Sequence, residues 1–186
     1  MAGIFYGIGV GPGDPALLTE KAKRCIKAAD VLAVPVNGKA ATAFSIVKQA
    51  VDLKEKPVLE LEFSMSGDRQ AWKTCAVQAA EAIGALLEEG RQVTLVTLGD
   101  VTLYSTCMYV FQLLKRRGFA AELVPGISAA SAGAALAGIS LARDQESVAV
   151  VFADLGLPGE YVGELEADRD YGYFTTVIVN KKYDRT

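Results

Sequence analysis

The sequence predicts an α/β protein built on a parallel β-sheet that is covered by helices on both faces. Short apolar segments alternate with amphipathic helical patterns through residue 124, which is the order that produces parallel strands joined by helices. One of these segments, residues 93–98, is apolar almost throughout, as is typical of a central strand buried on both faces. With 186 residues and 51% apolar side chains, the chain is long enough for one large domain or two small ones.

Short segments rich in apolar and β-branched residues indicate the strands, and apolar residues repeated every 3.6 positions indicate the helices. The expected strands of the sheet are residues 3–10, 30–35, 58–63, 93–98 and 120–124. The expected helices between them are residues 20–29, 41–51, 70–89 and 103–117. Each helix therefore connects two consecutive strands, as a parallel sheet requires.

Capping and turn residues set the ends of several of these elements. Thr19 is a suitable N-cap for the first helix, because its hydroxyl can accept a free backbone N–H of the first turn. Gly90 ends the third helix, and Gly118 stands at the C′ position after the fourth, whose last turn is basic. Asn37 and Gly38 are expected to form a turn after the second strand.

The stretch 90–105, GRQVTLVTLGDVTLYS, joins the central strand to a polar cluster. Gly99 ends the strand at a point where a side chain would obstruct anything lying against the backbone. Asp100, Thr102 and Tyr104 follow, so a carboxylate and hydroxyls gather at the carboxyl end of the strand, where open α/β sheets bind ligands. The alternative is an ordinary strand-to-helix loop in which Asp100 or Thr102 is the N-cap, and the stretch alone leaves both open.

The loop after the first strand, residues 9–15, does not carry the dinucleotide-binding fingerprint G-x-G-x-x-G. Counted from its two possible starting glycines, the third glycine position is occupied by Pro12 or Asp14. Asp30 opens the second strand instead of ending it, so it cannot reach a ribose in the usual way. The loop keeps an accessible backbone, but it is not a Rossmann loop.

Composition excludes several classes of function. The net charge is −3 with scattered basic residues, which does not resemble a nucleic-acid-binding surface. Histidine is absent, which removes imidazole bases, Ser-His triads and histidine-held metals, and no metal site is expected.

The three cysteines lie far apart and are expected to be reduced core thiols. No signal-peptide pattern or apolar run of about 18 residues is seen, so a cytoplasmic protein without a membrane partner is expected.

Residues 125–128, PGIS, are the expected hinge into a second unit. A helix of small residues is expected over 129–137, where the alanines permit close packing against neighbours. Strands are expected over 147–151 and 173–179, the second of which is rich in β-branched and aromatic residues. The segment that separates these two strands is mostly polar.

Three loops, in their order and spacing, resemble the signature loops of the tetrapyrrole (corrin/porphyrin) methylase family. They are GIGVGPGDPALLT at 7–19, LGDVTLYST at 98–106 and VPGISAASA at 124–132. The resemblance covers nearly all of residues 3–151 and the closing YFTTVIV. Within the family, the middle segment DLKEKPVLELEFSMSGDRQAW and the YST of the second loop are most similar to the precorrin-2 (or cobalt-factor II) C20-methyltransferases.

The resemblance implies a two-domain fold. Residues 1–124 would form the N-terminal parallel sheet covered by helices, and residues 125–186 a C-terminal mixed sheet domain with helices. The second loop of the family usually reads GDP, whereas this chain has Val101 in place of the proline. Val101 must therefore keep the same backbone conformation without a proline ring to fix it. Family members also carry a longer second domain, so this one is expected to be incomplete, with residues absent near Val151 and Phe152.

The resemblance also implies S-adenosylmethionine as the methyl donor, a reduced tetrapyrrole as the acceptor, and a homodimer. The residues expected to bind the donor are Pro12, Leu98, Gly99, Asp100, Leu103, Tyr104, Ser128 and Ala129. Asp100 is expected to bind the amino group of the donor or to favour its sulfonium. For Tyr104, a role as a core aromatic with a satisfied hydroxyl is an equal alternative.

The implied reaction is methyl transfer to the C-20 meso carbon of precorrin-2 or cobalt-factor II in cobalamin biosynthesis. A sulfonium is already activated and a meso carbon flanked by enamine-type nitrogens is already electron-rich, so the protein has to align them and exclude water. No catalytic residue is assigned. The alternatives are methylation of another substrate, such as uroporphyrinogen III or a modified translation factor, and a non-catalytic or redox nucleotide-binding module.

Overall fold

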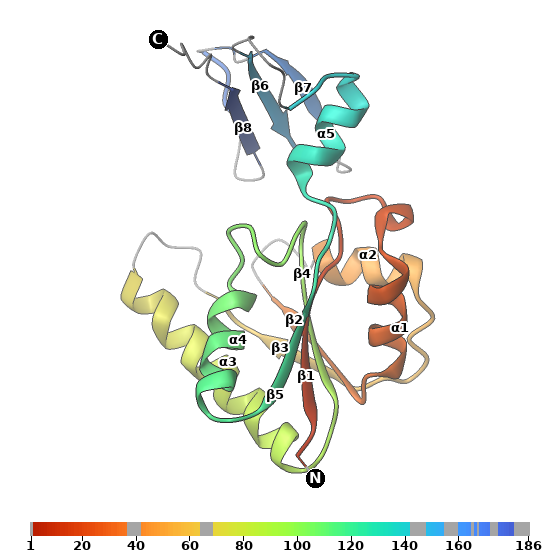
Figure 1. Ribbon diagram of the computed structural model, residues 1–186, viewed down its shortest axis with the longest axis vertical. Coiled ribbons are helices and arrows are strands. Elements are labelled where there is room, and N and C mark those ends of the chain that lie inside the picture. The colour runs from red at the N-terminus through yellow and green to blue at the C-terminus, as the bar shows by residue number, and fades with distance from the viewer. Residues whose placement is uncertain are drawn as a thin grey trace, which may run out of the picture. The chain divides into compact units, whose positions relative to one another are not determined.

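The alternating segments of the N-terminal part form a five-stranded parallel sheet in the computed structural model (Figure 1). The strands are β1 (Ile4–Gly9), β2 (Val31–Pro35), β3 (Val58–Leu61), β4 (Val93–Thr97) and β5 (Ala120–Val124). Their order is β3-β2-β4-β1-β5, and every neighbouring pair is parallel. The predicted α/β class and parallel sheet are confirmed, and the apolar segment at 93–98 supplies the middle strand.

The structure describes residues 2–36, 42–63, 69–141, 148–154, 160–164, 166, 168–171 and 175–180. The predicted turn at Asn37 and Gly38 lies outside these residues. The chain divides into two units, Met1–Ile127 and Ser128–Thr186, and each is described by itself. In the described part, no helix is both long and apolar enough to cross a membrane.

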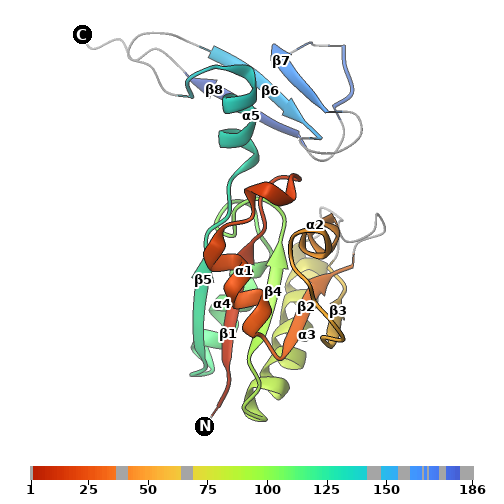
Figure 2. The same cartoon turned by 90° about the vertical axis from the view of Figure 1, so that its right-hand side faces the viewer.

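Helices cover both faces of the five-stranded sheet in the first unit (Figure 2). One face carries α1 (Glu20–Ala28) and α2 (Thr42–Ala50), and the other carries α3 (Arg69–Glu88) and α4 (Cys107–Arg116). A short 3-10 helix, η1 (Pro15–Leu17), precedes α1. The predicted double coverage of the sheet is therefore confirmed.

Two hydrophobic cores lie on opposite faces of the sheet, because successive side chains of a strand point to opposite sides. On β4, Val93 and Leu95 belong to the core under α3 and α4, whereas Val96 belongs to the core under α1 and α2. Ile83 of α3 and Ile26 of α1 are fully buried in these two cores. Burial of each such side chain stabilises the fold by about 1.5–3 kcal/mol, so the two cores fix the position of the strand ends.

Several predicted helix ends are confirmed by their contacts. The Thr19 hydroxyl accepts the N–H of Ala22 at 3.2 Å and caps α1. Gly90 and Gly118 follow α3 and α4 with φ of +81° and +86°, a backbone conformation that glycine adopts without steric cost.

The start of α4 differs from the prediction. This helix begins at Cys107 rather than near Leu103, because Tyr104 has φ of +50°, which an α-helix does not contain. The alternative that Asp100 or Thr102 is the N-cap of this helix is therefore wrong. The residues between β4 and α4 instead form a loop that carries polar side chains.

All three cysteines are free, as predicted. Cys107 is fully buried, and this burial raises the pKa of its thiol to about 12. Cys25 and Cys75 are partly buried. The Cys107 thiol is thus protonated at neutral pH, which suits a packing role and not a nucleophile.

The second unit contains α5 (Ala129–Ala137) and the strands β6 (Val148–Ala153), β7 (Tyr161–Glu164) and β8 (Thr175–Asn180). Their order is β7-β6-β8, and both described pairs are antiparallel, which corrects the expectation of a mixed sheet for these residues. The connection from β6 to β7 is too short for the crossover that a parallel pair needs. The predicted strands 147–151 and 173–179 correspond to β6 and β8, whereas β7 has no predicted counterpart.

The small-residue helix of the second unit packs closely on its sheet. A Cβ placed on Gly133 of α5 would lie 2.0 Å from Cδ1 of Phe152, a β6 side chain that is 1% exposed. The predicted close approach of this helix to its neighbours is confirmed. Val151 and Phe152, where family residues are expected to be absent, are consecutive residues of β6.

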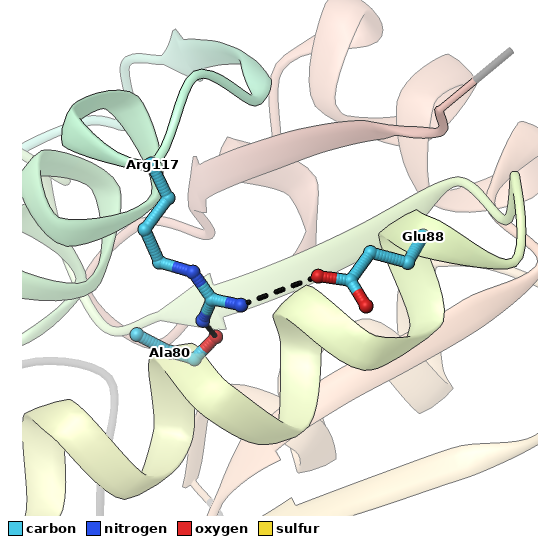
Figure 3. Close-up of polar contacts among 3 residues, drawn as sticks. All are labelled: Ala80, Glu88 and Arg117. Carbon is cyan, nitrogen blue, oxygen red and sulfur yellow. Dashed lines mark hydrogen bonds and ion pairs between the residues drawn. The ribbon is translucent and has the colours of Figure 1, made fainter.

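Arg117 links α4 to α3 in the first unit (Figure 3). Its Nη1 donates to the carbonyl oxygen of Ala80 at 3.2 Å, and its Nη2 lies 3.4 Å from Oε1 of Glu88. Gly84 leaves room for the guanidinium, since a Cβ there would lie 2.7 Å from Nη1.

Replacement of Arg117 by alanine is expected to lower the free energy of unfolding by about 1–2 kcal/mol, because a charged donor to a carbonyl is lost. Glu88→Gln is expected to change it by less than about 0.5 kcal/mol, because exposed ion pairs contribute little. Urea unfolding of both variants measures the difference. Equal losses would mean that the ion pair, and not the carbonyl contact, holds the two helices.

Candidate functional site

Two glycine loops meet at the carboxyl edge of β1 and β4, which are neighbours in the sheet. The chain leaves β1 toward β2 and leaves β4 in the opposite direction toward β5, so the strand order reverses here, and open α/β sheets bind ligands at such points. The N–H of Gly11 donates to the carbonyl of Gly99 at 3.2 Å, and the N–H of Gly99 donates to the carbonyl of Gly11 at 2.8 Å. The two loops are therefore joined backbone to backbone.

A third loop lies against the same backbone. A Cβ placed on Gly126 would lie 2.2 Å from the carbonyl oxygen of Gly99 and 2.6 Å from the carbonyl carbon of Gly9. A Cβ on Gly9 would in turn lie 2.7 Å from the nitrogen of Gly126. The three main chains are thus in direct contact, and at positions 9 and 126 only glycine leaves room for this. We call Gly9, Gly99 and Gly126 the glycine junction.

Asp100 connects the second loop to the third. Its Oδ1 accepts the N–H of Thr102 at 2.9 Å and also the Thr102 hydroxyl, and its Oδ2 accepts the N–H of Gly126 at 2.9 Å. Burial raises the pKa of this carboxyl, but the hydrogen bonds from Thr102, Gly126 and Val101 outweigh burial, so its pKa lies below the ordinary value. Asp100 is therefore a carboxylate at neutral pH and holds the two loops together.

Asp100 is expected to make the first unit less stable in acid. A folded-state pKa below the unfolded value of about 3.9 stabilises the folded state above that pH, and the contribution is lost as the pH falls through the folded pKa. The free energy of unfolding, measured in urea from neutral pH to about pH 3, should converge for wild type and Asp100→Asn. A difference that stays constant with pH would contradict this assignment.

One side of the second loop is open. A Cβ placed on Gly99 would meet no atom within 4 Å, although the residue is held at φ of +67°. A ligand can therefore lie directly against this part of the backbone. The described residues include no group of three or more potential metal-ligating side chains.

Comparison with known proteins identifies the family. Residues 5–185 match the family described as Tetrapyrrole (Corrin/Porphyrin) Methylases. The chain belongs to this family. The membership predicted from the three loops is confirmed.

Two relatives and one solved structure illustrate what this tetrapyrrole methylase resembles. It is 42% identical over 178 residues, 95% of this chain and 71% of the relative, to the "Probable cobalt-precorrin-2 C(20)-methyltransferase" of Methanocaldococcus jannaschii. It is 29% identical over 236 positions, 99% of each chain, to the cobalt-precorrin-2 C(20)-methyltransferase of Salmonella typhimurium. The structure of the methyltransferase CobJ shares the fold with a TM-score of 0.69 at 17% identity, covering 96% of this chain and 94% of that one.

Four of the predicted donor-binding residues of the methylase lie in the two loops that meet at the carboxyl edge of β1 and β4. Pro12 is buried in the first loop, next to Gly11, which bridges to the second loop. Leu98, Gly99 and Asp100 follow β4 directly, and the side chain of Leu98 packs against the core under α1 and α2. The structure therefore brings the first two predicted loops together.

Of the other four predicted residues, two lie in the loop that follows Asp100 and two belong to the second unit. Leu103 and Tyr104 are 53% and 103% exposed, so the alternative of Tyr104 as a core aromatic is wrong. Ser128 and Ala129 belong to the second unit, where the Ser128 hydroxyl accepts the N–H of Ser131 at 3.1 Å and caps α5.

Sequence analysis of this methylase missed the partners of Asp100. Thr102 and Gly126 hold the carboxylate, and Gly126 stood in a recognised loop but without an assigned role. Val101 takes the place of the usual proline of the second loop and is fully buried in the core under α3 and α4. The buried Val101 side chain therefore holds the loop in place without the proline ring.

Proposed function

We propose that this tetrapyrrole methylase transfers a methyl group from S-adenosylmethionine to the C-20 meso carbon of precorrin-2 or cobalt-factor II in cobalamin biosynthesis. The observation that carries the proposal is the 42% identity, over 95% of this chain, to the Methanocaldococcus jannaschii protein whose name states C(20) methylation of cobalt-precorrin-2. The junction of three glycine loops at the reversal of strand order supports a ligand site in the first unit.

The residues of the first unit fit the proposed donor. S-adenosylmethionine supplies, when bound, a methyl group activated by a sulfonium. The open side of Gly99 would hold it against the backbone, beside Leu98 and Pro12. Oδ2 of Asp100 accepts the N–H of Gly126 and keeps a second lone pair for an amino group. Leu103, Tyr104, Ser128 and Ala129 are further proposed contacts of the donor.

The chain's own groups are proposed to act by positioning. Asp100 is ionised and accepts hydrogen bonds from two residues, which suits a fixed negative group better than a proton carrier. The whole sequence contains no histidine that could take the proton lost by the acceptor. Catalysis would then come from alignment of donor and acceptor and from exclusion of water.

We also propose that the second domain, residues 125–186, is shortened relative to the family near Val151 and Phe152. The alignment with the Salmonella typhimurium relative spans 236 positions, more than the 186 residues of this chain, which supports the proposal. A homodimer is proposed as the functional assembly, and sedimentation velocity tests it.

The proposed function is tested by titration with S-adenosylhomocysteine and by a methylation assay under anaerobic conditions. We expect binding of S-adenosylhomocysteine and transfer of one methyl group to C-20 of precorrin-2, with or without cobalt, located by nuclear magnetic resonance. Methylation of uroporphyrinogen III instead would select the alternative substrate of the family. Binding of NAD or FMN without binding of S-adenosylhomocysteine would overturn the proposal in favour of a nucleotide-binding module.

A further inference from the structure

A groove of about 510 Å³ lies in the first unit beside the loop that carries Asp100. Three elements line it: the beginning of α3, the loop after β4, and one face of α4. Its main lining residues are Trp72, Thr102, Tyr104, Met108, Tyr109 and Gln112. We call this the aromatic groove.

Helical spacing explains how the groove forms. Gln112 lies three residues after Tyr109 and four after Met108, so its side chain neighbours both on the surface of α4. Trp72 of α3 meets Tyr109 edge to face, with ring centroids 5.5 Å apart and planes at 83°. Both helices begin at the carboxyl edge of the sheet, since each follows a parallel strand, and this is also the edge of the glycine junction. The aromatic groove and the proposed donor loop therefore share one edge of the sheet.

Tyr104 is held in an unfavourable conformation without compensating packing. Its φ of +50° is rare for a residue with a Cβ, and its side chain is 103% exposed, so its ring buries no surface against the described residues. Strained residues of this kind cluster at ligand sites, where the bound molecule supplies the missing contacts. The observation points to a ligand that stacks on this ring.

The chemistry of the groove selects the kind of ligand. Three aromatic rings and the Met108 side chain offer apolar surface, while Tyr109 and Gln112 offer neutral hydrogen-bond donors. None of the described lining residues is charged, so the groove suits the apolar face of a ligand. A conjugated macrocycle with carboxylate side chains has a flat apolar face for the rings and acceptor atoms for the donors. The volume accommodates one edge of such a macrocycle.

We propose that the aromatic groove binds one edge of the tetrapyrrole acceptor, with Tyr104 stacked on the macrocycle and the Trp72–Tyr109 pair as the opposite wall. This inference rests on the proposed function. Thr102 ties the two sites together, because it lines the groove and also donates to Asp100. The acceptor bound here would thus lie next to the loop proposed to hold the methyl donor.

The test compares Tyr104→Ala with Tyr104→Phe and with Val77→Ala, an exposed α3 position outside the lining of the groove. Binding of precorrin-2 is followed by the fluorescence of Trp72, which is the only tryptophan of the chain and lies in the groove. Tyr104→Ala is expected to weaken acceptor binding at least about fivefold, the loss of one stacked ring, while Tyr104→Phe and Val77→Ala stay within about twofold. The affinity for S-adenosylhomocysteine should not change in Val77→Ala, and in Tyr104→Ala it should fall less than the affinity for the acceptor, because Tyr104 is also a proposed contact of the donor.

Three other outcomes would contradict the inference, and they distinguish a wrong groove from a wrong function. Wild-type protein that binds S-adenosylhomocysteine and methylates precorrin-2, with an unchanged acceptor affinity in Tyr104→Ala, overturns the groove alone. Wild-type protein that neither binds nor methylates any tetrapyrrole overturns the proposed function and the groove with it. A wild-type dimer that Tyr104→Ala converts to monomers, seen by sedimentation velocity, would assign the groove to a subunit interface and also overturn the inference.

Discussion

Asp100→Ala is expected to weaken the binding of S-adenosylhomocysteine at least tenfold and to lower the free energy of unfolding by about 2–3 kcal/mol. The substitution removes an acceptor from the Thr102 N–H, the Thr102 hydroxyl and the Gly126 N–H at once. The loss of the carboxylate also removes the side-chain link between the second loop and Gly126. Calorimetric titration measures the affinity, and urea unfolding measures the stability.

Asp100→Asn separates the two roles of this side chain. Its carbonyl oxygen can still accept from Thr102, but its NH₂ group cannot accept the N–H of Gly126, so an intermediate loss of stability is expected. A stability loss in Asp100→Ala with unchanged affinity for S-adenosylhomocysteine would mean that Asp100 only holds the loops. In that case its proposed contact with the donor would be wrong.

Gly126→Ala is expected to lower the free energy of unfolding by about 3 kcal/mol or more, because the added methyl has no room. It would meet the backbone of Gly99 at 2.2 Å and that of Gly9 at 2.6 Å, and main-chain atoms cannot move aside as the end of a flexible side chain can. The loss should appear as a lower urea midpoint. Gly9→Ala, which meets the same junction from the other side, should behave alike.

Gly118→Ala is the matched control for this substitution. Gly118 has φ of +86°, but a Cβ there would meet no atom within 4 Å, so the variant should lose only about 1–2 kcal/mol for its backbone conformation. A loss in Gly126→Ala no larger than that in Gly118→Ala would contradict the close contact of the three loops. Since the control should fold, it also shows whether the assay responds to a glycine substitution as such.

The sequence predicted the first unit well, because its signals are local. Buried strands such as 93–98 are apolar enough to be recognised alone, and Thr19 and Gly118 mark helix ends by their own chemistry. The start of α4 was missed because the positive φ of Tyr104 is imposed by the surrounding loop, while its apolar neighbours fit a helical pattern. The strand β7 was missed because it exists through pairing with β6.

The candidate site could be predicted only in part, for a similar reason. Asp100 stands in a recognisable loop, but its partner Gly126 is 26 residues away in the chain, and only the folded sheet brings them together. Of the aromatic groove, the sequence indicated only the loop residues Thr102 and Tyr104. Trp72 and Tyr109 lie on different helices, and only the packing of these helices brings their rings together.

The glycine junction has a consequence for the thermodynamics of ligand binding. Its contacts join main chain to main chain, and the loops are continuous with β1 and β4, so they are ordered before any ligand arrives. A ligand that meets ordered loops does not have to supply the conformational entropy of fixing them. Binding at this edge of the sheet should therefore carry a small entropic penalty from the protein, because the main-chain contacts and the Asp100 carboxylate already hold the loops in place.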